Sequence, residues 1–113
     1  MPYVHLSIPN SLNEAEVNEL REAMVSLMPI LPTKTRENTM IHIEPGCHIA
    51  LGNPEPPCLF LEARLYQASP WESKQQFVRE ISALLEQRLG VPQSRMYINL
   101  IELEHWGAGG VYS

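Results

Sequence analysis

The sequence predicts an α/β fold of the α+β type, in which two pseudo-symmetric β-α-β units form one four-stranded mixed sheet with two helices on one face. Two observations lead to this fold class. Strand, helix and strand patterns follow one another twice along the chain, and the apolar stripe of the first helix recurs at matching positions in the second. A helix between consecutive strands makes each strand pair parallel, with a right-handed crossover. We therefore expect one domain over residues 1–113, with an internal repeat of 2–52 and 58–110.

The first half of the chain contains a strand, a helix and a second strand. Polar and apolar residues alternate over 2–8, as in a strand with one buried face. Asn13 and, three residues later, Glu16 form a capping-box signature before an apolar helical stripe, which ends at Pro29. The β-branched residues of 39–44 predict the second strand.

The second half repeats this order. Residues 58–66 predict a strand, and Ser69 to Glu72 form a second capping box with proline at the first helical position. Gly90 marks the end of that helix, and 95–103 predict the last long strand. A glycine-rich tail, 105–110, follows. Both helices have a single apolar stripe and would cover one face of the sheet, which leaves the other face for a neighbouring subunit.

Composition excludes several classes of partner. The net charge is −5 and the basic residues are scattered, so the chain has no basic patch for a nucleic acid. No apolar run approaches the roughly 18 residues of a membrane span. The chain begins without the basic segment and apolar core of a signal peptide. We therefore expect neither a nucleic acid nor a membrane as partner, and a cytoplasmic location.

The sequence also predicts neither a cofactor nor a metal. Cys47 and Cys58 lack the CxxC spacing of a redox or zinc site. His42, Cys47 and His48 have the spacing of neither a helical histidine pair nor a zinc finger. Asp is absent, which removes a Ser-His-Asp triad. Acid–base chemistry is left to Glu, His, Lys, Tyr and the chain terminus.

Pro2 is the most informative single residue. Removal of Met1 would leave a secondary amine at the chain terminus, within a strand rather than a loose tail. A free α-amino group titrates near about 7.7 to 8.0, and burial or a nearby cation lowers that pKa further. A neutral Pro2 nitrogen would then be a usable general base, whereas retention of Met1 would make it a non-basic amide.

Several segments together carry a resemblance to a known family. The chain begins Met1-Pro2, has Lys34 in the loop before the second strand, and has Tyr97-Ile98-Asn99 in the last long strand. With these features it resembles the tautomerase superfamily, and within it the macrophage migration inhibitory factor family. The best-matching segments are 41–45, 50–52, 55–58 and 95–99. The second half, including the tail, is also similar to 4-oxalocrotonate tautomerase (4-OT).

This resemblance implies the tautomerase fold, a homotrimer with active sites at the subunit interfaces, and cofactor-independent keto-enol tautomerisation of small 2-oxo acids such as phenylpyruvate. It assigns Pro2 as the general base and Lys34 as the cation that binds a carboxylate or enolate and lowers the pKa of Pro2. Lys74, near the start of the second helix, is expected to be solvated. The candidate substrate-binding residues are Tyr97, Asn99, Arg36, Arg64, Tyr66 and Trp106.

Structural roles remain open for these residues. Tyr97 and Asn99 share one strand face and match residues that the family supplies from the adjacent subunit, with cross-strand pairing on a polar sheet face as the alternative. Arg64 could bind a carboxylate or pair with a glutamate, and Arg36 could assist or replace Lys34. Trp106 could wall the pocket or pack structurally.

Two further functions remain open. Relatives that act as cis-3-chloroacrylic acid dehalogenase or decarboxylase-like hydratases combine the proline with extra arginines and a water-activating glutamate, for which Arg36, Arg64 and Glu62 are candidates. The third alternative is a non-catalytic binding or signalling protein of the same fold. Thiol redox activity is not expected, because the family's Cys-x-x-Cys is replaced here by the sequence 58–61, Cys-Leu-Phe-Leu.

Overall fold

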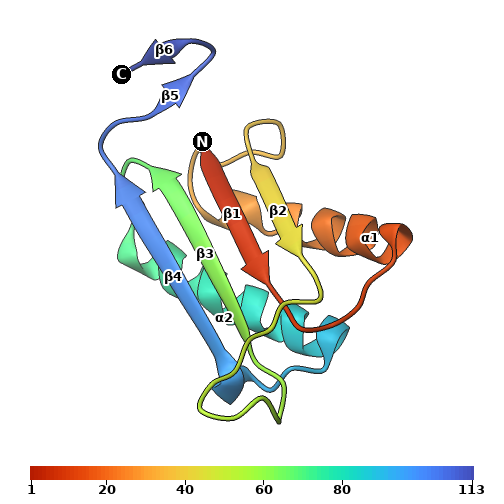
Figure 1. The fold of residues 1–113 in the computed structure, drawn as a ribbon. Coiled ribbons are helices and arrows are strands. Elements are labelled where there is room, and N and C mark those ends of the chain that lie inside the picture. The colour runs from red at the N-terminus through yellow and green to blue at the C-terminus, as the bar shows by residue number, and fades with distance from the viewer.

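A computed structural model describes residues 1–113 and contains one four-stranded sheet with two helices (Figure 1). The predicted α+β architecture and its mixed sheet are confirmed. In chain order the elements are β1 (Pro2–Ser7), α1 (Glu14–Val25), the 3-10 helix η1 (Met28–Ile30), β2 (Met40–Glu44), β3 (Leu59–Tyr66), α2 (Trp71–Leu89), the 3-10 helix η2 (Gln93–Arg95), β4 (Met96–Leu103), β5 (Gly107–Ala108) and β6 (Val111–Tyr112).

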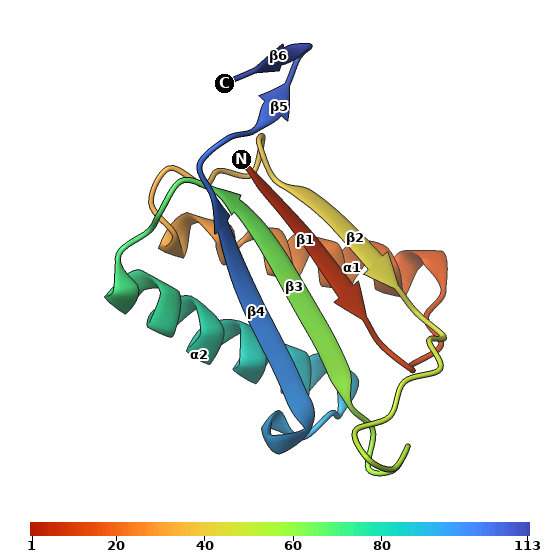
Figure 2. The same ribbon diagram turned by 60° about the vertical axis from the view of Figure 1, so that its left-hand side comes forward.

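The sheet has the strand order β2-β1-β3-β4, so the two β-α-β units meet in its centre. Strands β1 and β2 are parallel, β3 and β4 are parallel, and the central pair β1 and β3 is antiparallel. Both helices lie on the same side of the sheet, and the opposite face is open (Figure 2). A core of 16 buried residues includes side chains from both units. The sheet therefore joins the two units through their first strands.

Helix α1 begins as the sequence predicts. The Asn13 side chain accepts a hydrogen bond of 2.8 Å from the Glu16 N–H, and the Asn13 N–H donates one of 3.0 Å to the Glu16 carboxylate. The α-helix ends at Val25, earlier than the apolar stripe suggests, and a 3-10 turn that contains Pro29 continues that stripe. Neither α1 nor α2 combines the length and apolar character that a membrane-spanning helix needs.

The start of helix α2 differs from the prediction. Pro70 occupies the N-cap position, and no side chain caps the helix. The Ser69 N–H instead donates a hydrogen bond of 2.6 Å to Glu102 on β4, and the buried Ser69 hydroxyl has no partner. The predicted capping box is therefore wrong, because the Ser69 N–H binds Glu102 of β4 instead of a glutamate in the first turn of α2. The predicted end is confirmed, since Gly90 has a φ of 72° and stops the helix in the left-handed conformation.

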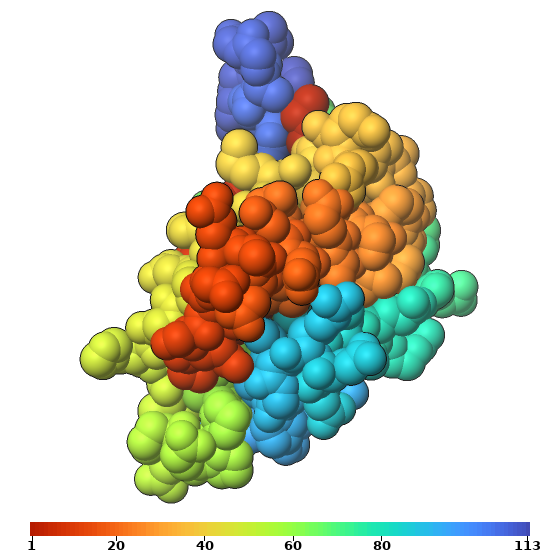
Figure 3. All heavy atoms as spheres, turned by 90° about the vertical axis from the view of Figure 1, so that its right-hand side faces the viewer, coloured from red at the N-terminus to blue at the C-terminus, as the bar shows by residue number.

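The glycine-rich tail forms a small hairpin that the sequence did not predict. Strands β5 and β6 pair antiparallel, and Trp106 and Ser113 exchange two backbone hydrogen bonds of 3.1 Å. The hairpin stands out from one end of the molecule (Figure 3). Its side chains are largely unpacked, because Val111 is 65% exposed and Tyr112 is 75% exposed.

Two substitutions test the difference between the helix starts. Asn13→Ala removes a cap that satisfies a backbone N–H, so we expect the free energy of unfolding to fall by about 1 kcal/mol. Ser69→Ala removes a buried hydroxyl that has no partner, so we expect no loss of stability or a small gain. Urea unfolding of both variants measures these free energies. A decrease of about 1 kcal/mol in the free energy of unfolding of Ser69→Ala would show that Ser69 caps the helix after all.

Candidate active site

The candidate site lies where β1 begins and where β3 and β4 end. Pro2 is buried and pairs with Leu65, and Leu65 in turn pairs with Glu102. The three residues form one row across the sheet, and the alternation of side chains directs all three to the face that the helices cover. The Met1 carbonyl accepts a hydrogen bond of 3.1 Å from the Tyr66 N–H, which extends the pairing by one residue. The chain terminus is thereby fixed beside the end of β3.

Lys34 comes to this end of the sheet from the loop after η1. It is 4% exposed, and its Nζ donates a hydrogen bond of 2.7 Å to the Tyr66 carbonyl. The backbone beside both partners is unusual, because Thr33 has a φ of 68° and Gln67, directly after Tyr66, has a φ of 67°. Burial lowers the pKa of Lys34, and the charge of Glu102 partly offsets that effect.

The terminal amine is within the electrostatic reach of Lys34. Burial, and then the charge of Lys34, lower the pKa of the Met1 α-amino group below its ordinary value. Tyr66 links the two groups, because its carbonyl accepts from Lys34 Nζ and its N–H donates to the Met1 carbonyl. Lys34 and the chain terminus were the two groups that the sequence singled out, and the structure brings them together.

Glu102 is a site residue that the sequence analysis missed. Its two carboxylate oxygens accept hydrogen bonds of 2.7 Å from Lys74 Nζ and 2.6 Å from the Ser69 N–H. The Lys74 hydrogen bond is the largest of several contacts that lower the pKa of Glu102. The available signal was its position, since Glu102 continues the alternation of Ile98 and Leu100 on the covered face of β4, where a charge is unusual.

Lys74 differs from expectation. The sequence predicted a solvated side chain, but the structure shows its ammonium paired with Glu102 at 2.7 Å with only 19% of the side chain exposed. It also lies 5.6 Å from the centroid of the Trp71 ring. The pattern of helix α2 alone could not show this contact, because the partner belongs to β4.

The structure places Tyr97 and Asn99 away from Pro2 within one chain. Tyr97 pairs with Phe60, which pairs with Ser7 at the far end of β1. Both residues are exposed, and their alternation with Ile98 and Leu100 directs them to the open face. They share one strand face as predicted, but a role at the Pro2 site would need a second chain.

The two candidate arginines are engaged in ion pairs. Arg36 lies 2.6 Å from a carboxylate oxygen of Glu22 on α1, and Arg64 lies 2.8 Å from Glu62 on its own strand. Arg64 alternates with the buried Leu65, so it belongs to the open face, opposite the Pro2 side chain. The glutamate pairing that the sequence left open for Arg64 is therefore the one that the structure shows.

Tyr66 and Trp106 lie together near Lys34. Tyr66 contributes its backbone carbonyl to Lys34, whereas its ring lies tilted against Trp106 with 6.4 Å between the ring centroids. Trp106 precedes the terminal hairpin and is half-buried. These two aromatic rings therefore border the end of the sheet at which Pro2 begins.

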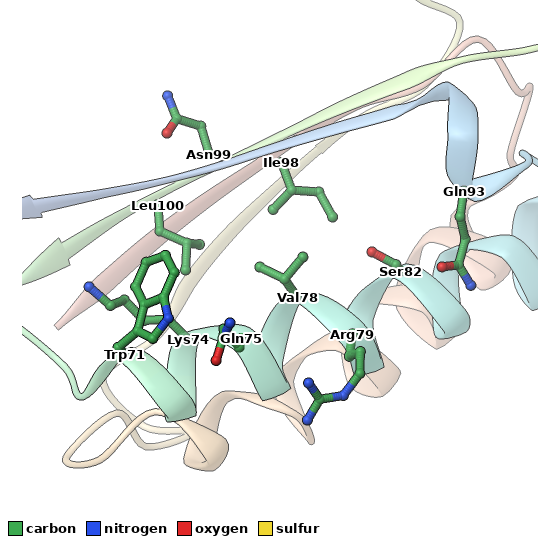
Figure 4. Close-up of a pocket in the computed structure, with 10 residues that line it drawn as sticks. All are labelled: Trp71, Lys74, Gln75, Val78, Arg79, Ser82, Gln93, Ile98, Asn99 and Leu100. Carbon is green, nitrogen blue, oxygen red and sulfur yellow. The ribbon is translucent and has the colours of Figure 1, made fainter.

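A separate groove runs between helix α2 and the edge strand β4 (Figure 4). Its volume is about 650 Å³, and neither Pro2 nor Lys34 lines it. Ile98 and Leu100 point from β4 towards the helix, whereas Asn99 points to the other side of the strand. Lys74, which binds Glu102, and Asn99 do line the groove, whereas the chain terminus does not.

The paired β-α-β units and the terminal proline strand beside a buried lysine define a protein of the tautomerase fold. Residues 1–111 match the family described as Macrophage migration inhibitory factor (MIF). The chain belongs to this family, as its sequence suggested. No curated protein matches the sequence.

Solved structures with the same fold come from diverse sources. Leishmania major MIF2 superposes with a TM-score of 0.89 at 17% identity, covering 100% of this chain and 97% of that one. The MIF-like protein of Entamoeba histolytica gives 0.85 at 14% identity, with 99% and 98% covered. Native fused 4-OT gives 0.83 at 18% identity, with 96% and 94% covered. These similarities establish the fold, and the 4-OT match agrees with the resemblance of the second half.

Substitution of Lys34 tests its coupling to the chain terminus. Lys34→Met has a side chain of similar length but lacks the ammonium charge, so we expect the pKa of the terminal amine to rise towards its ordinary value. The rise is partial, because burial is the larger cause of the lowering. The pH dependence of terminal acylation, followed by mass spectrometry, measures this pKa. Arg36→Gln is the control, and an unchanged pKa in Lys34→Met would remove Lys34 from the electrostatics of the site.

Proposed function

We propose that this protein is a cofactor-independent keto-enol tautomerase of small 2-oxo acids such as phenylpyruvate, with Pro2 as the general base after removal of Met1. The observation that carries the proposal is the buried Lys34 beside the chain terminus, whose charge lowers the pKa of the terminal amine. The same influences acting on a Pro2 amine favour its neutral form near pH 7, which is the form that accepts a proton.

The proposed reaction transfers one proton in each direction. The neutral Pro2 nitrogen removes the proton alpha to the 2-oxo group, and the C–H electron pair becomes the carbon–carbon double bond of an enolate. The protonated Pro2 then returns this proton to the enolate oxygen, which gives the enol and regenerates the neutral amine, and the reverse sequence gives the ketone. Lys34 stabilises the developing oxygen charge, since its ammonium has three donors, of which the Tyr66 carbonyl takes one at 2.7 Å and the Thr33 hydroxyl a second at 3.5 Å.

The choice of 2-oxo acids is supported by charge and by one structural neighbour. Lys34 supplies a cation for a carboxylate, whereas Arg36 and Arg64 are paired with glutamates. The neighbour Pt0534, which superposes with a TM-score of 0.78 at 19% identity, is described as inactivated by 2-oxo-3-pentynoate. That compound is itself a 2-oxo acid, so the same class of small molecule is the first to test here.

We also propose a homotrimer in the cytoplasm, with an active site at each subunit interface. The open face of the sheet carries exposed apolar side chains, including Met40 at 66% and Tyr97 at 62% exposure, which a second subunit would cover. Tyr97 and Asn99 would then act at the Pro2 site of the adjacent subunit. Tyr66 and Trp106 would border that site from the same chain as Lys34.

One of the two alternatives, the hydratase, receives less support from the side-chain contacts. A hydratase of the dehalogenase or decarboxylase type needs a glutamate that activates water, and Glu62 already pairs with Arg64 at 2.8 Å. A binding or signalling protein without catalysis is compatible with the family and the fold. Turnover by correctly processed protein distinguishes that alternative from the enzyme.

Replacement of the proline tests the proposed base. Pro2→Ala keeps a terminal amine but replaces the cyclic secondary amine by a primary one, so we expect kcat/KM for phenylpyruvate to fall by about 100-fold. An ultraviolet assay measures turnover, and intact mass on the same sample shows whether Met1 is absent. Size-exclusion chromatography checks that assembly is unchanged. Normal turnover in processed Pro2→Ala would contradict the assignment, and no turnover in the processed parent protein would favour the binding alternative.

Subunit complementation tests the shared site. We expect Pro2→Ala and the double variant Tyr97→Phe/Asn99→Ala to be separately impaired. Mixed trimers, refolded together from equal amounts, should regain activity in about one quarter of their sites, because one subunit then supplies Pro2 and its neighbour supplies Tyr97 and Asn99. If the mixture shows only the average activity of the two separate variants, then Pro2, Tyr97 and Asn99 of a single site come from the same chain.

A further inference from the structure

A cluster of two histidines and a glutamate lies on the open face of the sheet. Strands β1 and β2 are parallel, with His5 directly opposite His42 and Ser7 opposite Glu44. The alternation of the strands directs His5, His42 and Glu44 away from the helices. Residues far apart in the sequence are thereby brought together, on the face opposite the buried Pro2 and Val4.

The geometry of this cluster is compact. The two imidazole rings are stacked, with centroids 4.3 Å apart and planes inclined by 5°. His5 Nε2 lies 2.7 Å from Glu44 Oε1. One ligand atom from each of the three residues lies within 4.8 Å of the others. Because an imidazole binds a metal close to its ring plane, one of the stacked rings turns out of the stack when all three groups share an ion.

A neighbouring tyrosine orients the second histidine. The Tyr3 hydroxyl lies 3.1 Å from His42 Nδ1, which leaves His42 Nε2 as the ring nitrogen available for a metal. A hydrogen bond on the other ring nitrogen is the usual outer contact of a metal-binding histidine, because it fixes the tautomer and the ring orientation. The cluster thus has three ligand groups and one supporting contact.

Ordinary side-chain pairing does not account for the whole arrangement. A partly exposed His5–Glu44 pair contributes little to stability. It also does not require His42 to stack on His5, and protonation of both rings would place two positive charges face to face. A cation held by both rings and the carboxylate uses all three groups at once.

We propose that His5, His42 and Glu44 bind one Zn²⁺ ion per chain, with water in the fourth position. Two imidazole nitrogens and one carboxylate oxygen suit zinc, whereas magnesium and calcium prefer sites made of oxygen. The ion takes the place of the hydrogen bond between His5 Nε2 and Glu44, and the neutral His5 ring then carries its proton on Nδ1. This proposal revises the sequence-based expectation of no metal, which considered His42 with Cys47 and His48 rather than with its neighbour across the sheet.

Titration calorimetry with zinc chloride tests the site in the full chain. We expect one ion per chain for the parent protein, and at least about tenfold weaker binding for His42→Gln and for Glu44→Gln. His48→Ala is the matched control, since it removes an exposed histidine outside the cluster. Cys47→Ser is a second control, because its thiol lies 3.1 Å from the Glu44 carbonyl and could compete for zinc. Both controls should bind as the parent does.

Absence of binding by the parent protein, or loss of binding only in the two controls, would overturn the proposal. A crystal grown with zinc provides a second readout that does not depend on folding of the variants. The anomalous difference density should lie among His5, His42 and Glu44, and a peak at Cys47 or His48 alone would refute the site. Tyr3→Phe should weaken binding by about tenfold without moving that peak.

Discussion

The antiparallel pairing of β1 with β3 is the constraint on which the rest of the structure depends. It joins the two β-α-β units into one sheet over one shared core. Because the first strand is central, the start of the chain is held between two neighbours rather than at an edge. The same pairing sets Pro2 against Leu65 and so brings the terminus to the loop that carries Lys34.

Sequence signals for the ends of helices were reliable where the hydrogen-bond partner is also close in the sequence. The Asn13 capping box and the Gly90 stop depend on residues within one turn, and both are present. Ser69 shows the opposite case, since its N–H is captured by Glu102, a partner on a distant strand. The terminal hairpin was also missed, because short glycine-containing strands have no alternating apolar pattern to reveal them.

The same distinction applies to the site. Pro2 and Lys34 could be singled out by chemistry and by resemblance, but their approach depends on how the two halves pair. Glu102 was visible only as a charge at a position that alternation reserves for apolar residues. The roles of Arg36 and Arg64 depended on which glutamates reach them, and no periodicity contains that information. For Tyr97 and Asn99 the sequence predicts that both side chains share one face of the strand, but it does not predict which groups they contact.

The left-handed backbone at Thr33 and Gln67 has a consequence for the evolution of this protein. Both residues carry a side chain where glycine would be relaxed, and they flank the two ends of the Lys34–Tyr66 hydrogen bond. Selection for heat resistance alone would favour glycine or asparagine at these positions. At Thr33 either change would also remove the hydroxyl that lies 3.5 Å from Lys34 Nζ, so a relaxed backbone there is gained at the loss of one contact to the cation.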